Sequence, residues 1–348
     1  MLIDIALDAV GSDQAPGPEI RGAIEACRKL PVRVHLVGPE AELRAMLKKR
    51  HLPADFPIVV HHASERIGME EKAAIAVRTK RDSSMRVGLK LVREKTVAGF
   101  VTAGNTGAAM ATAKMVLGML PGVDRPALAT ALPSSGESPC ILLDVGANVD
   151  CKPHNLEQFA VMGELYSRNV LKIAKPRVGL LSIGEEETKG NDLTRESFAL
   201  LRALPLNFIG NVEGRDLFNG HADVIVCDGF VGNVALKASE GLAKLVRSEL
   251  RQAMGSNPLY MLGAFLSKGA FNNFRKRLDY TEYGGAPLLG LRGACIIGHG
   301  SSNARAIYNG IRVAAEFAQS GISQEMKDAL TPPATPANSD GNTTVPAL

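Results

Sequence analysis

The chain has 348 residues, and its 40 Lys and Arg residues against 36 Asp and Glu residues give a formal net charge of +4. Hydrophobic residues make up 45% of the chain and charged residues 22%, a balance that excludes bulk disorder, collagen and coiled coil. The net charge is too small to indicate a nucleic-acid partner. The length allows two domains or one large α/β unit.

The first residues do not resemble a secretory signal. Asp4 and Asp8 interrupt the apolar run that a signal peptide needs, and no segment reaches the ~20 apolar residues of a membrane-spanning helix. We therefore expect a cytoplasmic protein. The cysteines lie far apart and form no C-x-x-C pair, which argues against a disulfide framework or a zinc site. They are Cys27, Cys140, Cys151, Cys227 and Cys295.

Short β-branched runs alternate with stretches of helical periodicity along the chain. The predicted strands are Ile3–Leu7, Val32–Val37, Ile58–Val60, Gly99–Thr102, Leu128–Ala131, Ile141–Leu143, Val178–Ser182, Asn207–Ile209, Val224–Cys227 and Ala294–Ile297. The clearest predicted helices are Ile20–Leu30, Glu40–Lys49, Ser84–Glu94, Leu156–Arg168 and Val231–Met254. This alternation predicts an α/β protein with a largely parallel sheet that helices cover on both faces.

No repeat or flexible linker divides the first 330 residues. We therefore expect residues 1–330 to form one two-lobed unit. The segment 331–348 contains four prolines, one charge and no aromatic residue. It buries too little apolar surface to offset its ordering entropy, and we predict a disordered tail there.

Glycines with neighbouring polar residues follow many of the predicted strands. Ligands of open α/β sheets bind beyond the carboxyl ends of strands, where small residues let the backbone approach. Each glycine taken singly is explained by a tight turn, but six such strand ends together predict a large composite site. These glycines include Gly11, Gly104, Gly107, Gly146, Gly184, Gly229, Gly232, Gly298 and Gly300.

The segment Gly104–Gly107 follows a strand and opens a predicted helix. Backbone N–H groups and the helix dipole at such a start suit a phosphate, and a helix cap is the alternative. The segment matches neither a Walker motif nor a dinucleotide fingerprint. Ser84 begins another predicted helix behind Lys80 and Arg81, and we expect its hydroxyl near the same anion.

Three further strand ends carry candidate catalytic side chains. Lys189 lies between acidic residues and a Gly-Asn pair, where it can form a fixed positive charge, although the glutamates before it also suit a solvated turn. Asn233 can donate to a developing oxyanion or cap a helix. His299 lies between two glycines and has room to reach a ligand. The spacings typical of a metal site are absent, and a serine hydrolase is a minor alternative because Gly300–Ala304 lacks the last glycine of a nucleophile elbow.

Basic residues are concentrated between Lys244 and Arg277. This segment holds seven basic residues against the single acidic Glu249, and the apolar run Leu259–Leu266 lies in its centre. Such a patch suits an anionic membrane surface or an acidic protein; a buried helix or a dimer contact is the alternative. Gly255–Pro258 favours a projecting helical hairpin near residues 250–277.

Six short motifs occur in an order that resembles one known family. The chain is similar to the PlsX-type phosphate:acyl-acyl carrier protein acyltransferases of bacterial phospholipid synthesis, over residues 1–330. It departs from the family pattern at Ser12, usually glycine, and at Glu70–Lys72. The motifs are Asp8–Pro16, Ala103–Ala108, Leu143–Asn148, Gly184–Gly190, Gly210–Asp216 and Asp228–Asn233.

The resemblance implies a fold and a reaction. The fold is a three-layer α/β/α sandwich with a mostly parallel sheet, like isocitrate and isopropylmalate dehydrogenases and phosphotransacetylases, in a homodimer. In the reaction, phosphate attacks the thioester of a fatty acyl-acyl carrier protein and gives acyl phosphate, with no cofactor. A membrane glycerol-3-phosphate acyltransferase then uses the acyl phosphate, and the family associates peripherally with the membrane.

We assign expected roles from this chemistry together with the residues. Asn105, Thr106 and Gly107 contact phosphate with Ser84 nearby, Lys189 stabilises charge, Asn233 donates to the carbonyl oxygen, and His299 protonates the thiolate. Membrane or carrier-protein contact is expected at Leu259, Leu262, Phe265, Leu266, Arg275, Lys276 and Arg277. Three alternatives stay open: a coenzyme A-dependent phosphotransacetylase, a metal-dependent decarboxylating dehydrogenase, and a membrane-associated scaffold without turnover.

Overall fold

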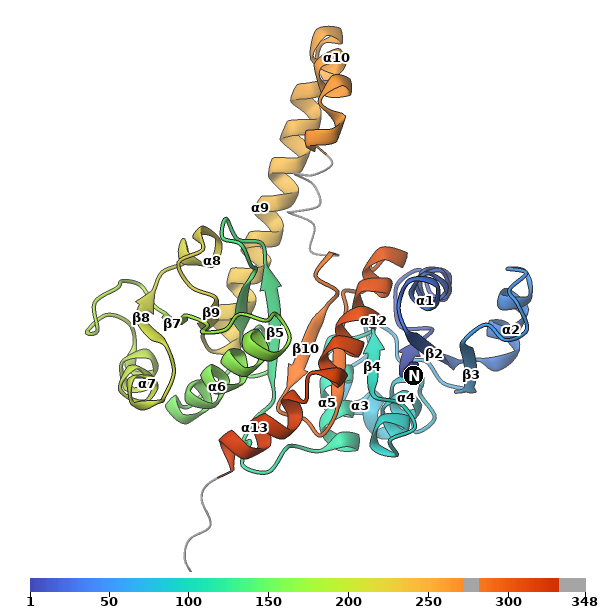
Figure 1. The fold of residues 1–348 in the computed structure, drawn as a ribbon, viewed down its shortest axis with the longest axis horizontal. Coiled ribbons are helices and arrows are strands. Elements are labelled where there is room, and N and C mark those ends of the chain that lie inside the picture. The colour runs from blue at the N-terminus through green and yellow to red at the C-terminus, as the bar shows by residue number, and fades with distance from the viewer. Residues whose placement is uncertain (272–281, 332–348) are drawn as a thin grey trace, which may run out of the picture.

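Strands and helices alternate through both halves of the molecule (Figure 1), whose computed structural model describes residues 1–271 and 282–331. The strands are β1 (Ile3–Asp8), β2 (Val32–Gly38), β3 (Ile58–His62), β4 (Gly99–Thr102), β5 (Ala127–Leu132), β6 (Cys140–Leu143), β7 (Val178–Leu181), β8 (Phe208–Val212), β9 (Val224–Val226), β10 (Ala286–Leu289) and β11 (Ala294–Ile297). Each of the ten predicted strands overlaps one of these, which confirms them.

The helices lie between the strands, as the periodicity predicts. They are α1 (Gly17–Lys29), α2 (Glu40–Lys48), α3 (Ala73–Thr79), α4 (Ser84–Arg93), α5 (Thr106–Leu117), α6 (Pro153–Asn169), α7 (Asp192–Ala203), α8 (Asp216–Asn219), α9 (Gly229–Gly255), α10 (Pro258–Leu266), α12 (Ala304–Gln319) and α13 (Ile322–Leu330). Of the predicted disordered tail, only Thr331 is described; its hydroxyl donates to the carbonyl oxygen of Lys327 at 2.6 Å and closes α13. The remainder of that prediction lies outside the described residues.

One sheet runs through the whole molecule, in the order β3-β2-β1-β4-β11-β10-β5-β6-β9-β7-β8. The five strands from β3 to β11 are parallel to one another, and so are the four from β6 to β8. Strand β10 is antiparallel to both of its neighbours, and β5 is antiparallel to β6. We call β1–β4 and β11 with their helices the first lobe, and β5–β9 with theirs the second lobe.

The sequence did not predict β10, because a proline in a central strand removes a donor from the ladder. The register explains how Pro287 is tolerated there. Ala286 and Pro287 pair with β11, whereas Leu288 and Leu289 pair with β5. Each half of β10 therefore bonds to one neighbour only, and Pro287 lies outside the pairing with β5.

Helices cover both faces of the sheet, and this three-layer α/β/α arrangement confirms the predicted fold class. In the first lobe, Ile5 and Leu7 of β1 pack on the side of α1 and α12, whereas Ala6 faces the cluster beneath α4 and α5. In the second lobe, α6 and α7 cover one face. Strands buried on both faces read as continuous apolar runs, as the predicted strands do.

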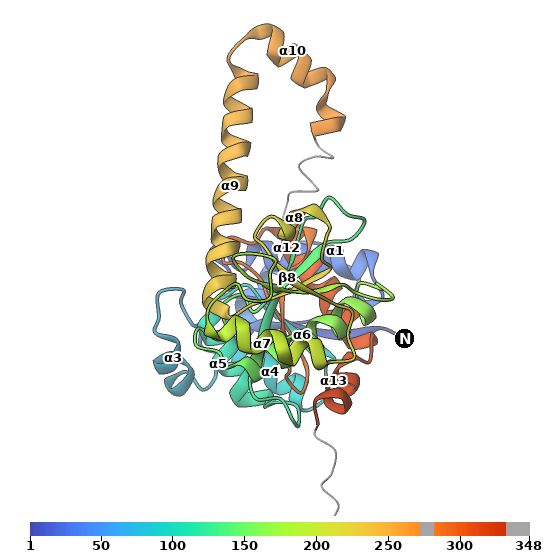
Figure 2. The ribbon, with the colours of Figure 1, turned by 90° about the vertical axis from the view of Figure 1, so that its left-hand side faces the viewer.

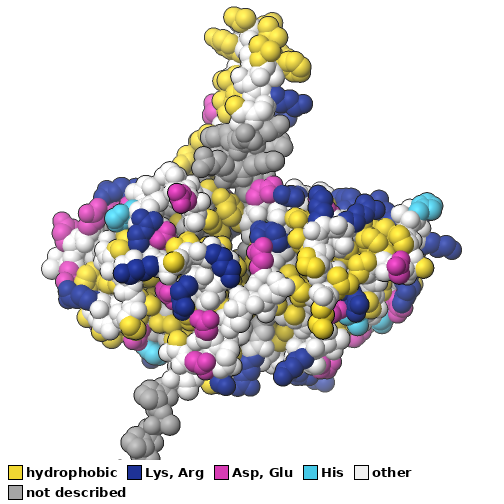
Figure 3. Space-filling view, viewed as in Figure 1, with side chains coloured by type: hydrophobic (Ala, Val, Ile, Leu, Met, Phe, Trp, Pro, Cys, Tyr) yellow, Lys and Arg dark blue, Asp and Glu magenta, His cyan; other side chains and the backbone are white. Residues whose placement is uncertain are grey.

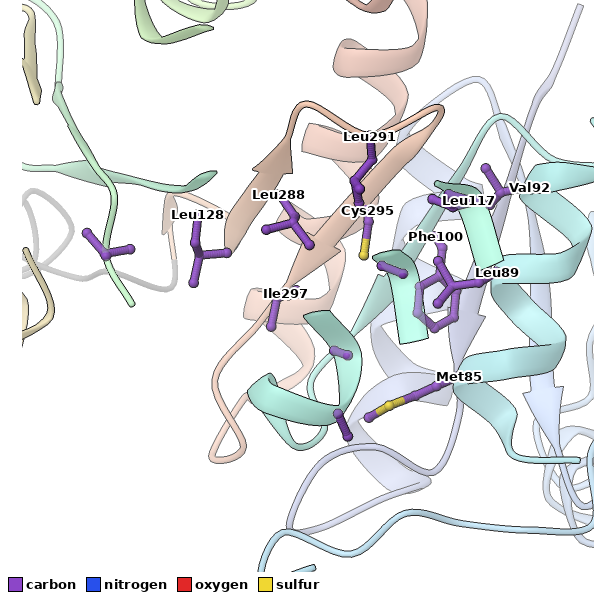
Figure 4. Close-up of a cluster of buried hydrophobic side chains, with 14 of the residues drawn as sticks. Met85, Leu89, Val92, Phe100, Leu117, Leu128, Leu288, Leu291, Cys295 and Ile297 are labelled. Atoms are coloured by element: carbon purple, nitrogen blue, oxygen red, sulfur yellow. The ribbon is translucent and has the colours of Figure 1, made fainter. Parts of the chain in front are cut away.

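A hydrophobic cluster links the two lobes on the face that carries α4 and α5. Met85 and Leu89 of α4 lie around Phe100 of β4, and the cluster continues across β11 to Leu288 of β10 (Figure 4). Gly88 makes the close packing of α4 on β4 possible, because a Cβ there would lie 2.3 Å from the Phe100 ring. The cluster therefore fixes α4, and with it the helix start at Ser84.

Helices α9 and α10 project from the sheet layers (Figures 1 and 2). Of the 27 residues of α9 only Gly229 and Gly232 are buried, and α10 has no buried residue. Asn257 caps α10 by accepting from the N–H of Leu259 at 2.8 Å. No helix in the described part of the chain is both long and apolar enough to cross a bilayer.

Candidate functional site

Three strand ends of the first lobe lie side by side. Because β1, β4 and β11 are adjacent and parallel, the segments after them meet at one edge of the sheet. The N–H of Asp13 donates to the carbonyl oxygen of Gly300 at 2.9 Å, and the N–H of Gly298 donates to that of Thr102 at 2.7 Å. The structure thus brings together segments that are about 300 residues apart in sequence; we call them the first strand-end group.

The start of α5 has two backbone donors available for an anion. Asn105 caps the helix through its Oδ1, which accepts from the N–H of Ala108 at 3.0 Å. Its Nδ2 donates to the carbonyl oxygens of Met69 at 2.8 Å and Glu71 at 3.1 Å. The Asn105 side chain therefore holds the 68–71 loop. Among the described residues, no group accepts from the N–H of Thr106 or Gly107, and these two donors point along the positive end of the helix dipole.

Ser84 lies inside the first strand-end group, in contact with Asp8. It is 2% exposed, and its hydroxyl is a side-chain hydrogen-bond partner of the Asp8 carboxylate. The sequence places this hydroxyl near the anion, whereas the structure engages it with a carboxylate beneath the anion-binding turn. Burial raises the pKa of Asp8, and its bonds from Thr102 and Ser84 oppose that rise.

His299 is exposed at the end of β11. Its Nδ1 accepts from the backbone N–H of Ser301 at 3.2 Å and lies 2.8 Å from the Ser301 hydroxyl oxygen. Because Nδ1 is an acceptor, the neutral ring carries its proton on Nε2. In this tautomer the Nε2–H can donate a hydrogen bond to a group outside the loop.

A second strand-end group forms where β6, β9, β7 and β8 end, since these four strands are also adjacent and parallel. The buried Asp144 accepts from the N–H groups of Leu128 at 2.9 Å, Ala147 at 3.1 Å and Asn148 at 2.6 Å. The first turn of α9 packs directly on this loop, because a Cβ at Gly232 would lie 1.9 Å from the carbonyl oxygen of Asp144. Asp144 therefore sets the position from which α9 begins.

Asn233 lies on that first turn, exposed and beside Gly146. A Cβ at Gly146 would lie 3.6 Å from the Asn233 Cγ, and Gly146 has a φ of +121°, which disfavours any other residue. The cap of α9 is supplied by Asp228, whose Oδ1 accepts from the N–H groups of Phe230 and Val231 at 2.9 Å. Asn233 is therefore not needed as a cap.

Lys189 follows β7 in the same group and is exposed. Its backbone N–H donates to the carbonyl oxygen of Glu186 at 3.0 Å, but within the described residues its ammonium makes no ion pair. The sequence predicts a charge fixed between acidic residues. Instead, Glu185 and Glu187 pair with Arg215 and Arg202, so those carboxylates are already neutralised and the Lys189 charge is not.

The two strand-end groups lie on the same side of the sheet. Ala108 of α5 belongs to the hydrophobic cluster against which Ala235 and Leu236 of α9 pack, and Figure 2 shows α5 and the lower part of α9 on that side. The strands of the two lobes run in opposite senses, but the sheet twists by roughly 20–25° per strand. Over the six strand steps from β1 to β9 this twist accumulates, so that the strands of the two lobes no longer point in opposite directions.

Four further residues that the sequence predicts as contact residues belong to helix α10 of the projecting hairpin. Leu259, Leu262, Phe265 and Leu266 are 70%, 55%, 71% and 76% exposed, and they lie far from both strand-end groups (Figure 1). Arg275, Lys276 and Arg277 lie outside the described residues. No group of three or more His, Cys, Asp or Glu side chains in residues 1–271 and 282–331 is arranged to hold a metal ion.

The contacts of Asn105 predict that Asn105→Asp and Asn105→Ala differ in stability. The aspartate keeps the cap acceptor and loses the amide donors to the 68–71 loop, whereas alanine loses both. A lost cap costs ~1 kcal/mol, so the free energy of unfolding in urea should fall by about that much more for alanine. Hydrogen exchange in residues 68–72 should accelerate in both variants. Equal unfolding free energies, or unchanged exchange, would contradict this account of Asn105.

Comparisons with known proteins add a family and a fold. The family model described as "Fatty acid synthesis protein" matches residues 3–325. A phosphate acyltransferase of Acidobacterium capsulatum is 70% identical over 334 residues, covering 96% of this chain and 99% of its own. One from Koribacter versatilis is 63% identical over 329 residues, covering 93% and 92%.

Two solved structures share the fold at low sequence identity. A phosphotransacetylase from Streptococcus pyogenes matches with a TM-score of 0.64 and 17% identity, covering 91% of this chain and 94% of its own. The EutD phosphotransacetylase from Staphylococcus aureus matches with a TM-score of 0.59 and 16% identity, with the same coverage. At this identity the likeness concerns the fold alone.

Proposed function

Since the chain belongs to the fatty acid synthesis protein family and is a phosphate acyltransferase, we propose that it transfers a fatty acyl group from acyl carrier protein to inorganic phosphate. A phosphate oxygen attacks the thioester carbonyl carbon, the carbon–sulfur bond breaks, and acyl phosphate and the free carrier thiol leave. The observation that carries the proposal is the pair of strand-end groups on one side of the sheet: among the residues that the structure describes, two backbone donors of the first group have no acceptor and the Lys189 ammonium of the second makes no ion pair.

Direct attack by phosphate requires no covalent enzyme intermediate. The cysteines support this, because burial raises the pKa of Cys151 to about 11 and that of Cys295 to about 12. A thiol with so high a pKa is almost wholly protonated at neutral pH and is a poor nucleophile. The enzyme's task is to hold the phosphate against the carbonyl and to stabilise the oxyanion that forms.

The proposed roles follow the positions of the side chains. The N–H groups of Thr106 and Gly107 bind the phosphate, and Asn105 presents them by holding the helix start. Lys189 stabilises developing negative charge, since no carboxylate of the described residues neutralises it. Asn233 donates its amide to the thioester oxygen, and the Nε2–H of His299 donates a hydrogen bond that stabilises the departing thiolate.

We predict that Lys189→Ala and Asn233→Ala each lower kcat at least 100-fold, because a lost oxyanion donor costs about 10²–10³ in rate. His299→Ala should cost less, about tenfold, because a thiolate leaves readily without a proton. Turnover is measured by trapping acyl phosphate as the hydroxamate, with circular dichroism to verify the fold. Near-wild-type turnover in folded K189A and N233A would refute these roles.

The same assay with acyl-coenzyme A as the acyl donor should give a much lower kcat/KM than with acyl carrier protein.

The projecting hairpin supports a role outside the chemistry. Its apolar side chains Leu259, Leu262, Phe265 and Leu266 are exposed on α10, and Figure 3 shows hydrophobic atoms gathered at its tip. We propose that this tip inserts into an anionic membrane surface, so that the acyl phosphate, whose acyl chain is apolar, is released next to the glycerol-3-phosphate acyltransferase that consumes it. The exposed Leu242, Leu245 and Val246 of α9 are proposed to contact a second copy in a homodimer on the cytoplasmic side.

We predict that the double variant L262D/F265D binds vesicles containing phosphatidylglycerol at least tenfold more weakly than the wild type in cosedimentation. Burying each of these side chains is worth about 1.5–3 kcal/mol, which the aspartates remove. Met115→Asp is the matched control, since Met115 is exposed on α5 and should leave binding unchanged. Wild-type sedimentation of L262D/F265D would exclude the tip as the membrane contact.

The basic residues of the segment 244–277 are proposed to dock the acidic carrier protein. Reversing Arg275, Lys276 and Arg277 to glutamate should raise the KM for acyl carrier protein about tenfold, since complementary charge steers association. The KM for phosphate should stay the same, because the strand-end groups are untouched. Both constants come from the hydroxamate assay at low salt, and an unchanged carrier KM would refute this docking site.

A further inference from the structure

Asp8 is a buried carboxylate at the heart of the first strand-end group. It ends β1 and is 1% exposed. In the described part of the chain no cation lies within ion-pair distance of it; Arg66 acts on it only through longer-range attraction. A buried carboxylate is costly unless hydrogen bonds compensate it. Its partners are the hydroxyls of Thr102 and Ser84 and the N–H of Val10.

Two hydrogen bonds through the Thr102 hydroxyl connect Asp8 to the turn that opens α5. The Thr102 Oγ1 donates to Asp8 Oδ2 at 2.7 Å, and the same Oγ1 accepts from the N–H of Gly104 at 3.1 Å. A hydroxyl has a single proton to donate, and Thr102 donates it in the hydrogen bond to the Asp8 carboxylate. The lone pairs of Thr102 therefore face Gly104, two residues before the N–H of Thr106.

Backbone contact makes the coupling rigid. A Cβ at Gly11 would lie 2.7 Å from Asp8 Oδ2 and 3.0 Å from the nitrogen of Gly104. A Cβ at Gly104 would lie 2.5 Å from the Met85 Cε and 3.4 Å from the Cα of Gly11. The loop after β1 and the turn after β4 thus pack without intervening side chains. A displacement of Asp8 or of its hydroxyl partner moves the turn.

We propose that Asp8 is a positioning residue that acts through Thr102 and Ser84 to hold the β4–α5 turn where the N–H groups of Thr106 and Gly107 bind inorganic phosphate. The inference rests on the proposed function, since it assigns phosphate to that turn. Asp8 does not touch the substrate. The hydroxyl of Ser84 acts from below the turn, which explains how a buried serine serves an anion that it does not contact.

The test compares variants that differ by one hydroxyl. Thr102→Val keeps the shape of the side chain and removes both bonds of the relay, whereas Thr102→Ser keeps them. We expect T102V to raise the KM for phosphate at least tenfold with the KM for the acyl donor within twofold of wild type, and T102S to restore the phosphate KM to within about threefold. Asp8→Ala should behave as T102V does, because it removes the oxygen that accepts from Thr102.

The matched control is Thr112→Val on α5. Thr112 is also buried, and its hydroxyl donates to the carbonyl oxygen of Ala108 at 2.7 Å without contacting Asp8. It should lower the melting temperature and leave the phosphate KM unchanged. A T102V enzyme that loses stability but keeps the wild-type phosphate KM would overturn the positioning role. If T102V does not fold, Ser84→Ala, which leaves the relay intact, should still raise the phosphate KM by about threefold, and an unchanged value overturns the role.

A binding measurement separates this inference from the proposed reaction. Inorganic phosphate alone should raise the melting temperature of the wild type and raise that of T102V much less. If the wild type makes no acyl phosphate but this difference is observed, the proposed reaction fails and the positioning role stands. If the wild type is active and phosphate stabilises T102V equally, the positioning role fails and the reaction stands.

Discussion

A single twisted sheet, with eleven strands in the part of the chain that the structure describes, determines where every candidate group of this protein can lie. The two parallel halves run in opposite senses because β10 and β5 reverse the direction in the middle. Twist then rotates one half relative to the other, and the starts of α5 and α9 pack against one cluster. An anion site from one lobe and a lysine and an amide from the other thus share one side of the molecule.

Within each lobe a buried carboxylate organises the loops. Asp8 collects bonds from Thr102 and Val10, and Asp144 collects the N–H groups of Leu128, Ala147 and Asn148. Both are desolvated, and for both burial raises the pKa. Without the hydrogen bonds, either charge would be too costly to bury. The same bonds therefore stabilise the loops and define the surfaces that face the substrates.

The hairpin follows a different physical rule. Almost none of α9 and none of α10 is buried, so core packing does not explain their apolar residues. Exposed apolar surface of this kind marks an interface. The chemistry and the proposed membrane contact are thus separated in space but joined by one continuous helix, since α9 begins beside Asn233 and ends next to α10.

The sequence by itself determined the fold class, ten of the eleven strands among the described residues, and the segments that form the strand ends, because apolar periodicity and glycines are local signals. It missed β10, where Pro287 contradicts a central strand and only the half-and-half pairing permits it. The sequence also indicated Asn105, Ser84 and Lys189 as candidate site residues, but it did not show which groups they contact. Those contacts join residues far apart in the chain, as Ser84 and Thr102 join Asp8. Only the tertiary structure decided that Asn105 holds a loop, that Ser84 bonds to Asp8, and that arginines neutralise the glutamates beside Lys189. Hydrogen bonds and ion pairs of this kind depend on which strands become neighbours in the sheet, and no local sequence pattern predicts that strand order.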